Sequence, residues 1–226
     1  LKDADWIIIT PGTATVYVDL SRDQIVANCH KLPAAAFEKR MLTTAEIISA
    51  FSVFYEQLRS VNPKAQVLLT VSPVRHLKDT LPVNSISKAT LLLATHELYN
   101  TFENVHYFPS YEIMNDDLRD YRFYKEDMVH PSGVAEQYLY EKFSESCFDP
   151  ELTKFEKRWQ KIEKSLAHRP FNAQSIKHQD FLKKILAELE DLSEKTDVQS
   201  EIDSVKAQLL LGSANATGEK HLNRCF

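Results

Sequence analysis

Gln66-Val-Leu-Leu-Thr-Val71 is a nearly continuous apolar run that ends at Pro73. A short run of this kind is typical of a strand that is buried on both faces of a parallel sheet. Two further runs have the same character: Trp6 to Thr10, which Pro11 closes, and Asn104 to Phe108, which also ends at a proline. We therefore expect three buried strands, each ending where a proline interrupts the pattern.

Helical patterns separate these strands. Thr43-Thr-Ala-Glu46 is a capping-box signature, and it opens an apolar stripe that continues to Leu58. After a loop around Pro82, a second helix is expected from about Ser87 to Asn100, and a third from Gly133 to Ser146. Strands and helices thus alternate along the chain, which predicts an α/β fold with a parallel sheet.

The composition changes at Pro150 to charged helix. Apolar stripes predict three helices in this part, at residues 152–168, 175–192 and 198–211. From Gly212 onward the chain is small and polar, and we expect it to be frayed. The chain therefore divides into an α/β domain at residues 1–148 and a helical extension at 149–226. The stripes serve either packing within the chain or a homodimer formed through these helices.

The bulk composition excludes several classes of partner. The 226 residues carry a net charge of -5, so no global basic field recruits nucleic acid. No apolar run approaches the roughly 18 residues that a membrane span requires. The three cysteines are far apart and fit reduced thiols better than disulfides or a zinc site. We expect neither a metal nor a cofactor, and the compartment is not determined, with the cytoplasm slightly favoured.

The chemistry is expected in a long segment that is dense in Asp, Arg and Tyr, from Tyr111 to Pro131. Irregular segments of this length inside a compact domain are usually functional when they are ordered. This one ends in Asp127-Met-Val-His130-Pro131, a carboxylate three residues before an imidazole. An Asp can hold a His in one tautomer and stabilise its protonated form, which makes His130 a candidate general base.

Other polar residues follow the predicted strands. Gly12 lies in a turn after the first strand, before an extended Val16 to Val18, and Arg75 and His76 leave the second strand. Ligands of open α/β sheets bind outside the carboxyl ends of the strands, where these residues gather. Two alternatives remain open for them. Imidazoles and carboxylates can bind zinc, from the set His30, His76, Asp127 and His130. The arginines at 75, 119 and 122 either bind an anionic group or pair with the aspartates at 116, 117 and 120.

Several phrases together resemble the GSCFA-domain family. They share a consistent order and spacing, and they are Thr10-Pro-Gly-Thr-Ala14, Asn28-Cys-His-Lys31, Thr70-Val-Ser-Pro-Val-Arg-His76, Asn84 with Ser87-Lys88, Tyr107-Phe-Pro-Ser-Tyr-Glu112, Leu118-Arg-Asp-Tyr-Arg-Phe-Tyr124 and Asp127-Met-Val-His130-Pro-Ser132. The resemblance covers roughly Asp5 to Phe143, and the helical tail has no part in it. The family is similar to the SGNH/GDSL hydrolases, which implies a three-layer α/β/α, flavodoxin-like fold.

The resemblance also implies a Ser-His-Asp site. Asp127 and His130 carry over as its acid and base. The serine belongs to the Gly-Ser-Cys-Phe-Ala motif that names the family, and this motif does not occur in the sequence. We therefore expect that a first strand or two, with the nucleophile, belongs before Trp6, and that these 226 residues alone are inactive.

The residues expected to stabilise the oxyanion depart from the pattern of many SGNH hydrolases. Those enzymes have a Gly-x-Asn whose Asn amide donates to the oxyanion, whereas this sequence has Gly12-Thr13-Ala14, and alanine offers no side-chain donor. Asn28 is the first candidate to replace the missing amide, and Arg75 and His76 are the next. The resemblance implies a serine esterase that acts on O-acyl esters of a carbohydrate or lipid-like substrate. The alternatives are a non-catalytic binding module, for a glycan, whose tail mediates assembly, and a metal-dependent hydrolase.

Overall fold

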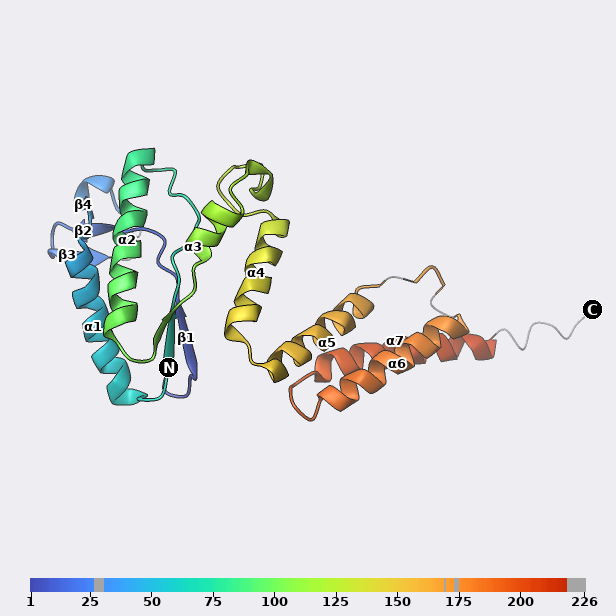
Figure 1. The fold of residues 1–226 in the computed structure, drawn as a ribbon. Helices are drawn as coiled ribbons and strands as arrows, with labels where there is room; N and C mark the ends of the chain where they lie inside the picture. The colour runs from blue at the N-terminus through green and yellow to red at the C-terminus, as the bar shows by residue number, and fades with distance from the viewer. Residues whose placement is uncertain (27–30, 169, 173–174, 219–226) are drawn as a thin grey trace, which may run out of the picture. The chain divides into compact units, whose positions relative to one another are not determined.

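The computed structural model describes residues 1–26, 31–168, 170–172 and 175–218. The chain forms two compact units, Leu1–Ser146 and Cys147–Phe226, and each has its own hydrophobic core (Figure 1).

A parallel sheet forms the centre of the first unit. Its strands are β1 (Trp6–Ile9), β5 (Gln66–Leu69) and β6 (Val105–Tyr107), in the order β1-β5-β6. Ile8 pairs with Leu68, and Leu68 pairs in turn with His106. The central strand, β5, is the most deeply buried, because it has a neighbour on each side. The prediction of an α/β fold built on these three runs is confirmed.

Two long helices, α1 (Thr44–Val61) and α2 (Leu81–Thr101), lie side by side on one side of the sheet (Figure 1). Their apolar residues pack on those strand residues that point toward them, and the buried members of this cluster are Leu58, Ala65, Val67, Leu69, Leu98 and Val105. The predicted capping box is present: the Thr43 hydroxyl accepts from the Glu46 N–H at 3.2 Å, and Glu46 accepts from the Thr43 N–H at 2.8 Å.

Replacing Thr43 by alanine is expected to destabilise the first unit by about 1 kcal/mol, because the helix loses its N-cap acceptor. Thr90→Ala makes the same chemical change in the exposed middle of α2, where the hydroxyl only bonds back to the Ile86 carbonyl. This control should leave the unit as stable as the wild type or slightly more stable. Urea unfolding followed by circular dichroism measures both, and equal effects of the two substitutions would contradict the capping role.

The start of α2 differs from the prediction. The helix begins at Leu81 rather than near Ser87, and Pro82 lies in its first turn instead of in a loop. Proline is tolerated there because the first N–H groups of a helix have no partner within the helix. The Thr80 hydroxyl caps this end, accepting from the Val83 N–H at 3.4 Å.

A second, antiparallel sheet is present that was not expected from the sequence. It consists of β2 (Thr15–Asp19), β3 (Gln24–Val26) and β4 (Phe37–Met41), in the order β3-β2-β4. Only the extended Val16 to Val18 was expected. β4 reads Phe-Glu-Lys-Arg-Met, so its central residues are charged and lack the apolar alternation from which a strand is recognised.

The segment after β6 folds into short helical turns instead of an irregular loop. These are α3 (Ser110–Glu112), the π-helical turn η2 (Ile113–Asp117) and the 3-10 turn η3 (Tyr121–Phe123). Helix α4 (Gly133–Cys147) follows, close to its predicted bounds. Met114, Leu118 and Ala135 bury one another in this part.

Helices cover both sides of the parallel sheet. In Figure 1 the sheet lies between α1 and α2 on one side and α3 and α4 on the other. On the α4 side, the Phe143 ring contacts the Phe108 ring edge to face at 5.3 Å. Trp6 and Ile8, on β1, are 53% and 57% exposed, and β1 is an edge strand among the described residues. That another strand precedes Trp6 stays a prediction.

The second unit is helical, as predicted. Its helices are α5 (Pro150–Leu166), α6 (Ile176–Leu192) and α7 (Gln199–Gly218). Helix α7 continues past the predicted end at residue 211, so the expectation of a frayed chain from Gly212 is wrong as far as Gly218.

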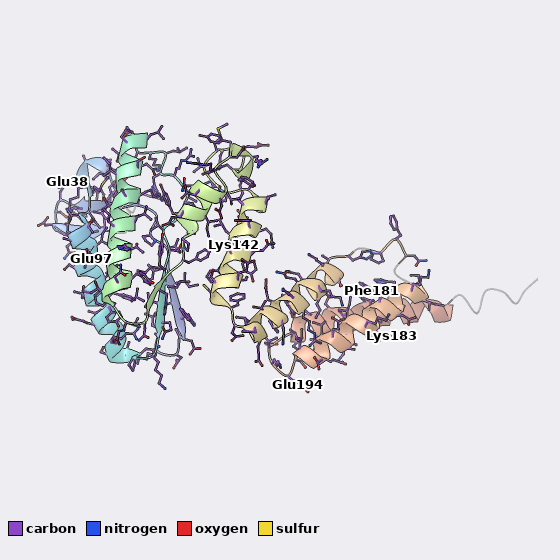
Figure 2. The ribbon with its side chains drawn as sticks, viewed as in Figure 1. Glu38, Glu97, Lys142, Phe181, Lys183 and Glu194 are labelled. Carbon is purple, nitrogen blue, oxygen red and sulfur yellow. The ribbon has the colours of Figure 1, made fainter. Side chains whose placement is uncertain are left out.

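The apolar stripes of these helices bury one another within one chain. The buried members are Ile162, Leu182, Ile185, Leu189, Leu192, Val198, Ile202 and Val205, and Phe181 (labelled in Figure 2) packs against them. Packing within the chain, one of the two interpretations left open, is therefore present, whereas the homodimer stays a prediction. No helix in the described ranges is long and apolar enough to cross a membrane.

Candidate functional site

The backbone around Asp127 and His130 forms a braced hairpin. Tyr124 and Pro131 pair across it as an antiparallel bridge. The Lys125 N–H donates to the His130 carbonyl at 2.8 Å, and the Met128 N–H donates back to Lys125 at 2.9 Å. Met128 lies in the left-handed region, with φ of 56°, which lets the chain reverse between the two functional residues. The loop therefore holds their side chains in a defined relation.

Asp127 and His130 contact each other directly. Oδ2 of Asp127 lies 2.7 Å from Nδ1 of His130, while Oδ1 accepts from the N–H groups of Val129 at 2.8 Å and His130 at 3.0 Å. The backbone N–H of His130, then its imidazole, then the Val129 N–H lower the pKa of Asp127 to about 2. The carboxylate is thus charged at neutral pH and accepts a hydrogen bond from the Nδ1–H of His130.

This arrangement assigns separate tasks to the two imidazole nitrogens. Because a charged carboxylate only accepts, His130 donates through Nδ1, and Nε2 carries the lone pair of the neutral ring. Nε2 has no hydrogen-bond partner among the described residues, and about half of the His130 side chain (55%) is exposed. His130 can therefore take a proton from a group that approaches from solvent.

The turn after β1 is held by two buried residues of α2. Nζ of Lys88 donates to the Gly12 and Ser72 carbonyls, both at 2.6 Å, and so joins the carboxyl ends of β1 and β5. Oγ of Ser87 accepts from the Ala14 N–H at 2.7 Å. Lys88 is 1% exposed, and burial lowers the pKa of its ammonium group to about 8.

Ser87 and Lys88 belong to the phrases that carry the family resemblance, but no role for the pair was predicted from the sequence. A signal was present, since the buried residues of α2 follow a helical period that includes Ser87, Lys88, Leu91, Ala94, Thr95 and Leu98. A lysine on the apolar stripe of a helix must find a polar partner inside the protein. Here the partners are the two strand-end carbonyls.

Arg75 and His76 connect this turn with the hairpin. A Cβ placed on Gly12 would lie 3.5 Å from Nε2 of His76, which is ordinary contact. The next residue toward the amino end, Arg75, holds its guanidinium carbon 5.2 Å from the centre of the Tyr124 ring, at the base of the hairpin. Gly12, Arg75 and His76 thus lie at one end of the sheet with the Asp127 hairpin, as the strand ends predicted.

The remaining candidates have different outcomes. Asn28, the first choice for the oxyanion donor, lies outside the described residues, as does His30 of the zinc alternative. Within the described part, no three His, Cys, Asp or Glu side chains are grouped closely enough to hold a metal ion.

The alternative of an arginine–aspartate network is wrong. Among the described residues, no ion pair joins Arg75, Arg119 or Arg122 to the aspartates at 116, 117 and 120.

Comparison with known proteins supplies the family. Residues 1–143 match the model of the GSCFA family, and residues 159–210 match a second model, GSCFA domain protein, C-terminal domain. No curated protein matches the chain. The second match corrects the expectation that the helical tail has no part in the resemblance, because most of that tail is itself a recognised GSCFA region. The chain belongs to the GSCFA family.

Proposed function

We propose that Asp127 and His130 are the acid and base of a serine ester hydrolase of the SGNH type. The observation that carries this proposal is the 2.7 Å contact between Asp127 and Nδ1 of His130, which leaves Nε2 of the half-exposed ring without a described partner. The nucleophile is assigned to the family's Gly-Ser-Cys-Phe-Ala motif, which these 226 residues do not contain.

In this mechanism Nε2 of His130 removes the proton of the serine hydroxyl as it attacks the ester carbonyl. Asp127 stabilises the imidazolium that forms, and His130 then passes the proton to the leaving alcohol. Water hydrolyses the acyl-enzyme through the same base. The substrate class is an O-acyl ester of a carbohydrate or lipid-like molecule, which rests on fold-level analogy.

The developing oxyanion needs a donor, and the backbone N–H of Gly12 is the described group best suited to it. Lys88 fixes the Gly12 carbonyl, and the Gly12 N–H forms no hydrogen bond with a described residue. A preorganised backbone donor stabilises the transition state without reorganising. Asn28, Arg75 and His76 remain further candidates for this role.

The lowered pKa of Asp127 predicts a pH-dependent contribution to stability. Its folded-state pKa of about 2 lies below the ordinary value of 3.8, so the contribution is complete above about pH 4 and is lost as the pH falls toward 2. Asp127→Asn should therefore be less stable than the wild type at pH 6, and this difference should narrow below pH 4. Thermal unfolding of both proteins from about pH 2 to 6 measures it, and a difference independent of pH would refute the assignment.

The alternative function is a non-catalytic glycan-binding module whose helical unit mediates assembly. The observation that favours it is the exposed Tyr121 ring, 60% accessible, beside a small polar pocket. Ester hydrolysis distinguishes the two functions. So does the residue at the motif's serine position, since a non-nucleophile there favours binding alone.

A further inference from the structure

A pocket with a volume of about 180 Å³ lies at the base of the hairpin that carries Asp127 and His130. Its walls come from the loop after β5 and from the segment that runs from η2 to the hairpin, and the polar lining residues are Arg75, Asn115, Arg119, Asp120, Tyr121 and Tyr124. Tyr124 belongs to both the pocket and the hairpin, because it lines the pocket and its backbone pairs with Pro131, next to His130. The pocket therefore adjoins, through Tyr124, the hairpin that carries the proposed catalytic pair.

The pocket holds positive charge that its lining residues neutralise only in part. Arg75 and Arg119 both line it, and neither forms an ion pair with a described residue. The one lining carboxylate, Asp120, caps η3 by accepting from the Arg122 N–H at 2.9 Å. Two guanidinium groups against one carboxylate leave a net positive site.

Aromatic rings hold Arg75 in place. Its guanidinium carbon lies 5.2 Å from the Tyr124 ring centre and 5.7 Å from that of Tyr121. A hydrogen bond to Tyr121 is the main cause that raises the pKa of Arg75 above its ordinary value. A guanidinium held between rings has less side-chain freedom to lose when it binds an anion, and the N–H groups that the tyrosines do not engage stay available to it.

We propose that this pocket binds a carboxylate or phosphate group of the substrate, so that the ester hydrolysed is carried by an anionic molecule such as an acidic sugar. That the bound molecule is a substrate rests on the proposed hydrolase function, whereas the binding of an anion in the pocket does not depend on it. Guanidinium groups recognise both anions through paired charge-assisted hydrogen bonds. The volume, equal to roughly six waters at about 30 Å³ each, admits one such group with part of a sugar ring.

The direct test is calorimetric titration of the chain with glucuronate, glucose 6-phosphate and glucose. The structure predicts that at least one anion binds and that glucose binds at least about tenfold more weakly, since a charge-assisted hydrogen bond contributes about 1.5–3 kcal/mol. Stronger binding of glucuronate identifies a carboxylate as the group recognised, and stronger binding of glucose 6-phosphate identifies a phosphate. Equal affinity for glucose and for both anions, or no binding of either anion, would overturn the proposal.

Three variants sharpen the titration. Arg75→Gln and Arg119→Gln should each weaken anion binding by about 10- to 100-fold, the range that such a hydrogen bond supports. Arg122→Gln makes the same charge change nearby, but the Arg122 side chain stacks on Phe123 at 4.8 Å and does not line the pocket, so anion binding should persist. If Arg75→Gln unfolds, Arg119→Gln decides, because Arg119 has no ion-pair partner whose loss would disturb the described structure. Equal weakening by all three variants would show a general charge effect and refute a pocket.

A second measurement separates this inference from the proposed function. In a chain that also carries the Gly-Ser-Cys-Phe-Ala motif, kcat/KM is compared for O-acetyl glucuronate and O-acetyl glucose. The ratio should favour the anionic ester and should fall about tenfold or more in Arg119→Gln. Anion binding without any ester hydrolysis would sink the hydrolase and leave the pocket standing. Hydrolysis of both esters with a kcat/KM ratio near one, unchanged in Arg119→Gln, would support the hydrolase and contradict the role of the pocket.

Discussion

Replacing Lys88 by methionine is expected to lower the free energy of unfolding of the first unit by about 2–4 kcal/mol. Methionine fills a similar volume, but the partly buried Gly12 and Ser72 carbonyls each lose a 2.6 Å hydrogen bond to Nζ. Each buried acceptor left without a donor costs about 1–3 kcal/mol, and the lost burial cost of the ammonium group offsets part of that sum. Denaturant unfolding at pH 7 measures the difference.

The pH dependence of stability has the same sign at Lys88 as at Asp127, because both folded-state pKa values lie below the unfolded ones, but at Lys88 it occurs at alkaline pH. The pKa of Lys88 falls from 10.5 in the unfolded chain to about 8 in the folded one, so the unfolded chain binds more protons between these values. The wild type should therefore gain stability relative to Lys88→Met as the pH rises from about 8 to 10.5. At high pH the neutral amine still donates to both carbonyls.

Lys142→Met is the matched control for this substitution. Lys142 (labelled in Figure 2) lies on the surface of α4 and pairs with Glu145 at 3.0 Å. An exposed pair of this kind contributes little to stability because solvent screens it, so the control should remain close to wild-type stability. A loss in Lys88→Met no larger than in Lys142→Met would mean that the strand ends do not depend on the buried ammonium group.

Replacing His130 by alanine is expected to lower kcat/KM for p-nitrophenyl acetate by at least about 10³-fold, in a chain that includes the Gly-Ser-Cys-Phe-Ala motif. General-base catalysis contributes about 10²- to 10⁴-fold, and the serine hydroxyl is a weak nucleophile without a base. His130 is half exposed, so its removal leaves no cavity in the core. The variant should therefore fold normally, which thermal unfolding checks.

His106→Ala is the control for the loss of a histidine. His106 lies on β6, contacts the Trp6 ring at 5.2 Å and bonds to Gln66 at 2.8 Å, and it belongs to no part of the proposed site. This variant should retain activity within a few-fold of the wild type. Full activity of His130→Ala would show that the imidazole is not the base, and equal losses in both variants would indicate a general structural effect.

The elements that local pattern determines could be predicted from the sequence. The apolar run at β5 predicts a buried strand and the residues at Thr43 predict a capping box, each from a few consecutive residues, and both are present. The contact between Asp127 and His130 is also local, because a three-residue spacing ended by a proline favours a tight turn. Long-range partners were not predictable in the same way.

The features that were not predicted from the sequence have a common physical cause. β4 is a strand because it pairs with β2, although its own residues Glu38, Lys39 and Arg40 read as exposed polar chain. Lys88 is buried where it bonds to carbonyls at the ends of two strands, and Arg75 contacts two tyrosine rings of a segment distant in the sequence. In each case tertiary contacts override the local preference of the residue.

The most direct test of the proposed acid–base pair is labelling with a fluorophosphonate probe, which reacts with an activated serine. The protein is a chain carrying the Gly-Ser-Cys-Phe-Ala motif, and the quantity measured is the labelling rate at pH 7 with the modified residue identified by mass spectrometry. We predict modification of the motif's serine in the wild type and in His106→Ala, and a rate at least about 100-fold lower in His130→Ala. An undiminished rate in His130→Ala, or labelling of a serine within residues 1–226 instead, would contradict the account.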